Sequence, residues 1–236
     1  MPKSVRQIIS SRVFTWLILV LAVATFNNWV LSLFFHNSLI LHGGEISELS
    51  VTGQPHALLF RSLDVISGIL FVFFATLILF KTINKTKKYS VLIVTTVALG
   101  ISNMLDALFP LRCSATNNPS CIININLNPS HFVFPSHGYS SVLIALCLLI
   151  LPLFGFFIAK SIKSQQFKVI SLVTFVANVL INLIVIYQYI INHTYRVPSI
   201  GIVSVDIQNC LPIFLLGVWF ISWLLAFYST KTNDLT

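Results

Sequence analysis

The charged residues of this chain are gathered into short clusters, and long uncharged apolar runs separate these clusters. Only 8% of the 236 residues are charged, whereas 56% are hydrophobic. A soluble chain of this length has too small an interior to bury so much apolar surface. Uninterrupted apolar runs are instead typical of transmembrane helices. We therefore predict an integral membrane protein that crosses the lipid bilayer several times.

Six apolar runs are long enough to cross the bilayer as helices. About 20 residues are needed for a helix that rises 1.5 Å per residue to cross roughly 30 Å of hydrocarbon. Strands of a membrane barrel would alternate apolar and polar residues, and these runs are continuous. The predicted fold class is an all-α bundle of six transmembrane helices, formed by a single integral membrane domain over residues 1–236. The predicted spans cover residues 13–35, 58–80, 89–109, 138–159, 169–191 and 211–228.

The basic residues predict the orientation of these spans. Eleven of the 14 lie on one predicted side, and Arg61, Arg112 and Arg196 lie on the other. Because cytoplasmic loops are enriched in Lys and Arg, both termini are predicted to be cytoplasmic, with the protein in the cell membrane (the inner membrane of a Gram-negative bacterium). The formal charge of +8 is then a topology signal, and no nucleic-acid partner is needed to explain it.

The N-terminal segment allows one alternative, a cleaved signal peptide. A basic start, the apolar stretch VFTWLILVLAVA and the small residues Ala22 and Ala24 fit such a peptide. The apolar character nevertheless resumes and continues to Phe35, which completes a full span. This continuation favours an uncleaved first helix.

Ionisable and hydroxyl side chains recur where four predicted helices reach the outer surface. Such groups are costly in lipid, so they usually face the bundle interior or water. Arg61 and Asp64 share one helix face, as do Ser102 and Asp106, because residues three or four apart are neighbours on a helix. Because these helix ends emerge together, we expect Arg61 to interact with Asp64 or Asp106 and His137 to lie close to Asp106. We predict an outward-facing polar pocket, and its candidate residues are Arg61, Asp64, Ser102, Asp106, Arg112, His137, Ser140 and Asp206.

Three functional classes are compatible with this pocket. The favoured class is a membrane protein that binds a lipid head group, a small solute or a partner. The first alternative is a hydrolase that acts at the outer surface through Asp106 and His137 as acid–base groups, with Asp64 as a further candidate. The second is a small-solute transporter whose path is lined by Asn178 and Asn182, although interhelical hydrogen bonding is the preferred interpretation of these amides. The sequence leaves open whether the chain is an enzyme and what its oligomeric state is.

No cofactor is predicted. A metal held by His137 and Asp106 is the less favoured alternative, because no helix carries the paired histidines of an HExxH or HxxxH pattern. Besides the lipid bilayer, the expected partner is a lipid or small-molecule ligand.

The four cysteines predict one disulfide. Cys113 and Cys121 lie in the outer loop PLRCSATNNPSC, which faces an oxidising compartment in the predicted topology. Cys210 lies near the same surface and is an alternative partner for either residue. Cys147 lies within the fourth span and is predicted to be a buried thiol.

Three segments resemble a known family. The runs ISELSVTGQPHALLFRSLDVISGIL, GISNMLDALFPLRC and SHGYSSVLIAL resemble the bacterial multi-pass family called domain of unknown function nine-nine-eight. Gly100, Phe109, Pro110 and His137 match its pattern of a helix that ends in Phe-Pro and a histidine that opens the next span. The likeness covers residues 15–228. It implies a bundle of six or seven helices, and the family carries no activity to transfer.

Overall fold

The computed structural model describes residues 11–35, 46–82, 86–114, 135–195 and 203–233. All regular secondary structure in these ranges is helical, which confirms the predicted all-α class. The helices are α2 (Arg12–Phe26), α3 (Val30–Phe34), the 3-10 helix η1 (Ile46–Ser50), α5 (Ala57–Lys81), α6 (Thr86–Leu108), α8 (Pro135–Ser161), α9 (Gln165–Tyr195) and α10 (Val203–Asn233).

Five of the described helices are long and apolar enough to cross a membrane, namely α5, α6, α8, α9 and α10. The predicted first span, residues 13–35, is not one continuous helix. It is divided into α2, which has 15 residues, and the short α3. The break follows from Asn27, whose side-chain amide and backbone N–H both donate to the carbonyl oxygen of Val23. The exact count of six spans therefore stays a prediction.

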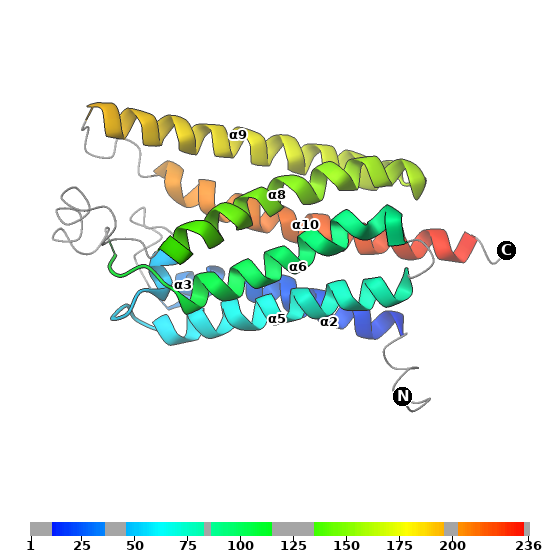
Figure 1. Cartoon of the computed structure of the whole chain (residues 1–236), viewed down its shortest axis with the longest axis horizontal. Coiled ribbons are helices and arrows are strands. Elements are labelled where there is room, and N and C mark those ends of the chain that lie inside the picture. Colours follow the sequence, from blue (N-terminus) through cyan, green and yellow to red (C-terminus); the bar gives the residue numbers. More distant parts are fainter. Residues whose placement is uncertain (1–10, 36–45, 83–85, 115–134, 196–202, 234–236) are drawn as a thin grey trace.

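Successive helices are neighbours in space. α2 packs on α5, α5 on α6, α6 on α8, and α8 on α9, while α10 contacts α9, α8 and α2. Neighbouring helices run in alternating directions, so the start of α2 and the end of α10 lie at the same end of the bundle (Figure 1). We call this end, where α5 leads to α6 and α8 to α9, the basic end. The opposite end, formed by η1, the first turns of α5 and α8 and the last turn of α6, is the η1 end.

The centre of the bundle is built on α10. Trp219, Phe220 and Trp223 are almost completely buried, and the two indole rings stack at 5.7 Å between centroids. The Trp219 indole N–H donates to the Ser171 hydroxyl of α9 at 2.9 Å. Gly155 of α8 leaves room for this ring, since a Cβ there would lie 2.6 Å from Trp219. Close packing of this kind holds membrane helices together, because lipid provides no hydrophobic force between them.

The closest approach between two helices lies where α5 crosses α6. A Cβ on either Gly68 or Gly100 would overlap the backbone carbonyl oxygen of the other glycine. Small residues at such a crossing let two backbones pack directly against each other. The α5–α6 pair is accordingly the most extensive helix contact in the bundle.

Asn178 and Asn182 take part in the structure of the helices, as the preferred interpretation of these amides predicted. The Asn178 side chain of α9 donates to the carbonyl oxygen of Leu148 on α8 at 2.7 Å. The Asn182 side chain donates to the carbonyl oxygen of Asn178 at 2.7 Å. The first bond joins two helices, and the second satisfies its amide within α9.

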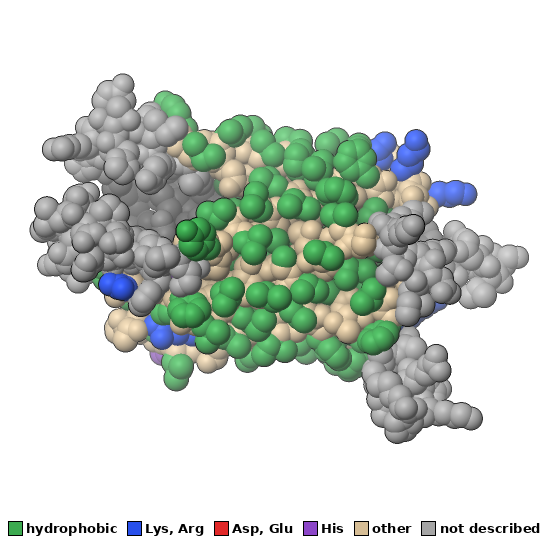
Figure 2. All heavy atoms as spheres, in the orientation of Figure 1, with side chains coloured by type: hydrophobic (Ala, Val, Ile, Leu, Met, Phe, Trp, Pro, Cys, Tyr) green, Lys and Arg blue, Asp and Glu red, His purple; other side chains and the backbone are tan. Residues whose placement is uncertain are grey.

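The outer surface of the bundle is apolar along its length. Figure 2 shows hydrophobic side chains over the middle of one face and Lys and Arg side chains only towards its two ends. Large exposed side chains in this zone include Phe157, Val173 and Phe214, each more than half exposed. In water such a surface would aggregate, whereas lipid chains cover it. These features indicate a membrane-embedded protein.

Candidate functional site

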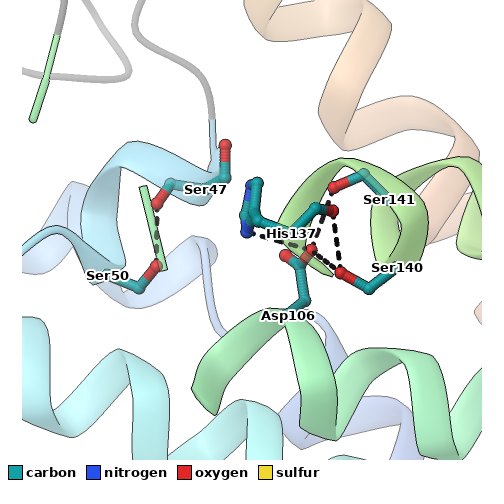
Figure 3. A network of polar contacts seen from close by, with 6 residues as sticks. All are labelled: Ser47, Ser50, Asp106, His137, Ser140 and Ser141. Carbon is teal, nitrogen blue, oxygen red and sulfur yellow. Dashed lines mark hydrogen bonds and ion pairs between the residues drawn. The ribbon is translucent and has the colours of Figure 1, made fainter. Parts of the chain in front are cut away.

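Two helix ends position the candidate site. α6 ends at Leu108, before Pro110, so Asp106 lies in its last turn. α8 begins at Pro135, a residue well suited to the first position of a helix because it has no N–H to leave unsatisfied. His137 and Ser140 consequently lie in the first turns of α8, facing the end of α6 (Figure 3).

Asp106 and His137 contact each other, as the sequence predicted. The Oδ1 atom of Asp106 lies 3.2 Å from Nδ1 of His137, and the two side chains are 22% and 5% exposed. The Nδ1–H is not aligned on the carboxylate, so the contact is an electrostatic pair and not a well-formed hydrogen bond. The imidazole is buried, and the carboxylate remains partly accessible.

Two hydroxyl groups also reach the same carboxylate oxygen. Ser140 Oγ and Ser141 Oγ lie 2.8 and 2.9 Å from Asp106 Oδ1, each as a donor (Figure 3). The Ser140 hydroxyl also lies 2.8 Å from the carbonyl oxygen of His137, so its single proton is shared between two acceptors. In the part of the chain that the structure describes, Oδ2 of Asp106 accepts no hydrogen bond.

A second carboxylate lies deeper, on α5. Asn28, in the break between α2 and α3, donates its amide to Asp64 Oδ1 at 2.6 Å. Asn103 of α6 donates to the backbone carbonyl oxygen of Asp64 at 2.8 Å. Asn103 precedes Asp106 by three residues on α6, so the two side chains are neighbours on that helix.

These contacts form two neighbouring groups, one around Asp64 and one around Asp106, and α6 carries a member of each. We call the two groups together the polar layer; it consists of Asn28, Asp64, Asn103, Asp106, His137, Ser140 and Ser141. Asn28, Asn103 and Ser141 were not among the predicted pocket residues. The position of Asn103 three residues before Asp106 is a signal in the sequence that would have identified it.

Arg61 does not join the polar layer, and its predicted pairing with Asp64 or Asp106 is wrong. Its Nε donates to the carbonyl oxygen of Ser50 at 2.6 Å, and its Nη2 donates to the Thr52 hydroxyl at 2.8 Å. The last carbonyl groups of a helix have no partner within it, so the end of η1 offers the guanidinium an acceptor. Asp64 points instead to Asn28 inside the bundle.

The other predicted pocket residues have separate surroundings. Ser102 is buried and donates to the carbonyl oxygen of Ala98 in its own helix at 2.7 Å. Arg112 is exposed, just after α6. Asp206 lies on α10, but its side chain is outside the described residues.

A buried carboxylate holds η1 in place. This residue was not among the predicted pocket residues. Glu48 is 3% exposed, and the Ser114 hydroxyl donates a hydrogen bond to its Oε2. Together with the Arg61 bond to Ser50, this contact holds η1 on the bundle. Figure 3 shows Ser47 and Ser50 of η1 on the side of His137 opposite to Asp106. The imidazole thus lies between η1 and the end of α6.

The described residues also bear on the predicted disulfide and on the metal alternative. Of the predicted disulfide, Cys113 is described and Cys121 lies outside the described residues, so the pair stays a prediction. Cys147 and Cys210 are buried and form no disulfide. Among the described side chains, no three of His, Cys, Asp or Glu are arranged to hold a metal ion; Asp106 and His137, the two residues named for a metal, lie in contact.

An apolar groove lies away from the polar layer. It has a volume of about 240 Å³ and lies between the α2–α3 segment and α10, facing the side of the bundle. Its lining consists of Val23, Ala24, Asn27, Val30, Phe214, Gly217, Val218 and Ile221.

Residues 13–205 match the family described as "Protein of unknown function (DUF998)". The chain belongs to the DUF998 family. The resemblance predicted from the sequence is thereby confirmed, and the matched DUF998 region contains every residue of the polar layer. No curated protein and no solved structure matches the chain.

The residues that carried the DUF998 resemblance have defined positions here. Gly100 forms the close crossing with α5. Pro110 follows the end of α6, and His137 contacts Asp106. These residues of the DUF998 pattern therefore serve both the packing of the bundle and the polar layer.

Proposed function

We propose that this protein binds an amine-bearing ligand, either a small solute or a lipid head group, at its η1 end. The Asp106 carboxylate is the observation that carries the proposal. It is partly exposed, its Oδ2 accepts no hydrogen bond among the described residues, and no described Lys or Arg pairs with it. A ligand ammonium group would donate to this oxygen and supply the missing positive charge.

The charge of the surrounding group supports a cationic ligand. The polar layer contains two carboxylates, Asp64 and Asp106, and one imidazole. The remaining partners are neutral amides and hydroxyls. Carboxylates near lipid are costly unless they are paired, so excess negative charge at this position favours a cation.

Ligand-dependent thermal unfolding of the purified protein tests the proposal. Ethanolamine and a diamine should raise the unfolding temperature, whereas phosphate and neutral sugars should not. Asp106→Asn should abolish the shift, because the amide presents no negative charge. Ser222→Ala is the matched control, since its hydroxyl donates only to Val218 of its own helix. A shift of equal size in Asp106→Asn and in the parent protein would contradict the proposal.

The hydrolase alternative is favoured by one observation, the Asp106–His137 pair, since a carboxylate beside an imidazole supports general-base chemistry. Ser140 and Ser141 donate to Asp106, and neither donates to the imidazole of His137; the second acceptor of Ser140 is the His137 backbone carbonyl. A serine nucleophile needs the imidazole as its own acceptor, so these hydroxyls do not support a serine mechanism. Release of product from an ester or amide lipid by the purified protein, lost in His137→Ala, would favour the hydrolase.

The transporter alternative has less support. Its proposed path used Asn178 and Asn182, and these amides are engaged in bonds to Leu148 and within α9. Uptake of a labelled amine into proteoliposomes, lost in Asp106→Asn, would favour transport over simple binding.

We further propose the Cys113–Cys121 disulfide. Its support is that Cys147 and Cys210, the other two cysteines of the chain, are buried and form no disulfide. Alkylation of the unfolded protein followed by mass measurement should find two protected thiols that a reductant releases. Four reactive thiols before reduction would exclude the bond.

A further inference from the structure

The turn between α8 and α9 at the basic end carries three lysines that the proposed function does not use. Lys160 lies in the last turn of α8, Lys163 in the turn itself, and Lys168 in the first turn of α9. Lys160 and Lys163 are exposed, and the Lys168 ammonium lies 5.2 Å from the centre of the Phe156 ring. Within the described ranges, no acidic side chain pairs with any of the three.

Lys163 occupies a backbone conformation that favours glycine. Its φ is +50°, and the Ser164 N–H donates to the carbonyl oxygen of Ala159 at 3.2 Å, which closes the end of α8. Helices that end in this way usually have glycine at the left-handed position, because a side chain there is strained. In this chain a lysine, with its charge exposed, occupies the position where glycine would be unstrained.

The surroundings of the turn place these charges at the edge of the membrane zone. Phe157, one turn before the end of α8, is 61% exposed, and Val169 and Leu172 on the first turns of α9 are 50% and 47% exposed. Apolar side chains that face lipid therefore directly adjoin the lysines. Figure 2 shows Lys and Arg side chains gathered at this end of the molecule.

We propose that the lysines of the α8–α9 turn form a binding site for the phosphate head group of an anionic phospholipid. An ammonium group near a membrane surface attracts anionic lipid, and lysine binds phosphate as a point charge. The exposed apolar residues beside the turn contact the acyl chains of the same lipid. This site lies at the opposite end of the bundle from the polar layer and binds a ligand of opposite charge.

Native mass spectrometry of the full chain in nanodiscs with equal parts of phosphatidylglycerol and phosphatidylcholine tests this site. The parent protein should retain phosphatidylglycerol preferentially. Each lysine near an anionic surface changes affinity about fivefold, so the variant K160Q/K163Q/K168Q should lose the preference by about tenfold or more. The variant K160R/K163R/K168R should keep it.

The matched control K85Q/K87Q/K88Q removes the same charge from residues 85–88, where α5 leads to α6, and should keep most of the preference. An equal loss in this control, or no preference in the parent protein, would overturn the proposal. Short-chain phosphatidylglycerol should raise the unfolding temperature of the detergent-solubilised protein, and inorganic phosphate should not; an equal effect of phosphate would overturn the assignment to lipid.

Lys163→Gly separates structure from binding. Glycine relieves the strain at φ +50°, so this variant should unfold at a higher temperature than the parent protein. It should nevertheless retain less phosphatidylglycerol. A Lys163→Gly protein with unchanged lipid preference would remove Lys163 from the site.

Discussion

Asp106 organises the η1 end because three groups from α8 converge on one of its oxygens. Its Oδ1 faces the His137 imidazole and both serine hydroxyls, and these groups have no other carboxylate within reach in the described structure. The side chain therefore has two roles. It joins α6 to α8, and its second oxygen is the acceptor in the proposed ligand site.

Two substitutions at Asp106 separate these roles. Asp106→Ala removes the acceptor of Ser141 and the contact of His137 and leaves Ser140 only the His137 carbonyl oxygen, so it should lower the free energy of unfolding by about 2–4 kcal/mol. Asp106→Asn keeps an oxygen acceptor for the hydroxyls and should cost clearly less. Thermal unfolding in detergent measures both variants. Equal destabilisation by alanine and asparagine would mean that the negative charge itself, and not the acceptor, holds the two helices together.

The sequence predicted which residues lie at the η1 end better than it predicted their partners. Helical spacing identified the faces that carry Asp64, Asp106 and His137, and all three joined the polar layer. Spacing does not identify what lies beyond a helix end. The sequence therefore predicted that Arg61 interacts with Asp64, its neighbour along the helix. In the structure, the Arg61 guanidinium donates instead to the carbonyl oxygen of Ser50 in η1.

The helices themselves were the most predictable elements, because continuous apolar runs admit only helix in lipid. The predicted span 58–80 differs from α5 by one residue at each end. Other ends were less accurate: α10 begins eight residues before the predicted 211, at Val203. Helices continue past the apolar run into polar residues, since backbone hydrogen bonding does not require apolar side chains. The same criterion could not predict the break at Asn27, because the apolar character of a run does not report where its backbone hydrogen bonding is interrupted.

A larger side chain at the crossing of α5 and α6 should destabilise the protein strongly. Gly100→Val should destabilise the protein by about 3 kcal/mol or more, because its side chain would meet the backbone of α5 and not a movable side chain. Yield and thermal unfolding measure the loss. Val94→Leu is a suitable control on the same helix, because Val94 is 65% exposed and its replacement should have little effect. A Gly100→Val protein as stable as this control would refute the close crossing.

Lys81 of α5 forms hydrogen bonds to the start of α2 and to α10 at the basic end. Its ammonium donates to the Ser11 carbonyl oxygen at 3.1 Å, to Thr15 Oγ1 at 2.6 Å and to the Tyr228 hydroxyl at 2.9 Å. Lys81→Met keeps most of the side-chain volume and removes these bonds, so it should cost about 2–3 kcal/mol in unfolding free energy. Lys160→Met, at an exposed position, should stay within about 0.5 kcal/mol of the parent protein when both are measured in a neutral detergent. Similar values for the two variants would show that the Lys81 bonds contribute little.

The molecule as a whole has a basic end and an η1 end, and this asymmetry predicts its orientation. Arg12, Lys81 and the lysines of the α8–α9 turn lie at the basic end, whereas Arg61 and Arg112 lie at the other. The positive-inside rule then assigns the basic end to the cytoplasm. Reporter fusions after Lys168 should be active in the cytoplasm, and a fusion near Asn117 should be active outside. A fusion after Lys168 that is exported would reverse the assignment.

The stacked indoles of Trp219 and Trp223 give the bundle an internal spectroscopic probe. Their rings are almost completely buried and 5.7 Å apart, so their electronic transitions couple and should produce a strong near-ultraviolet circular dichroism signal. The signal depends on α10 remaining packed against α8 and α9, because Gly155 and Ser171 contact one of the two rings. Unfolding of the centre can therefore be followed without any label, and separately from fraying at either membrane surface.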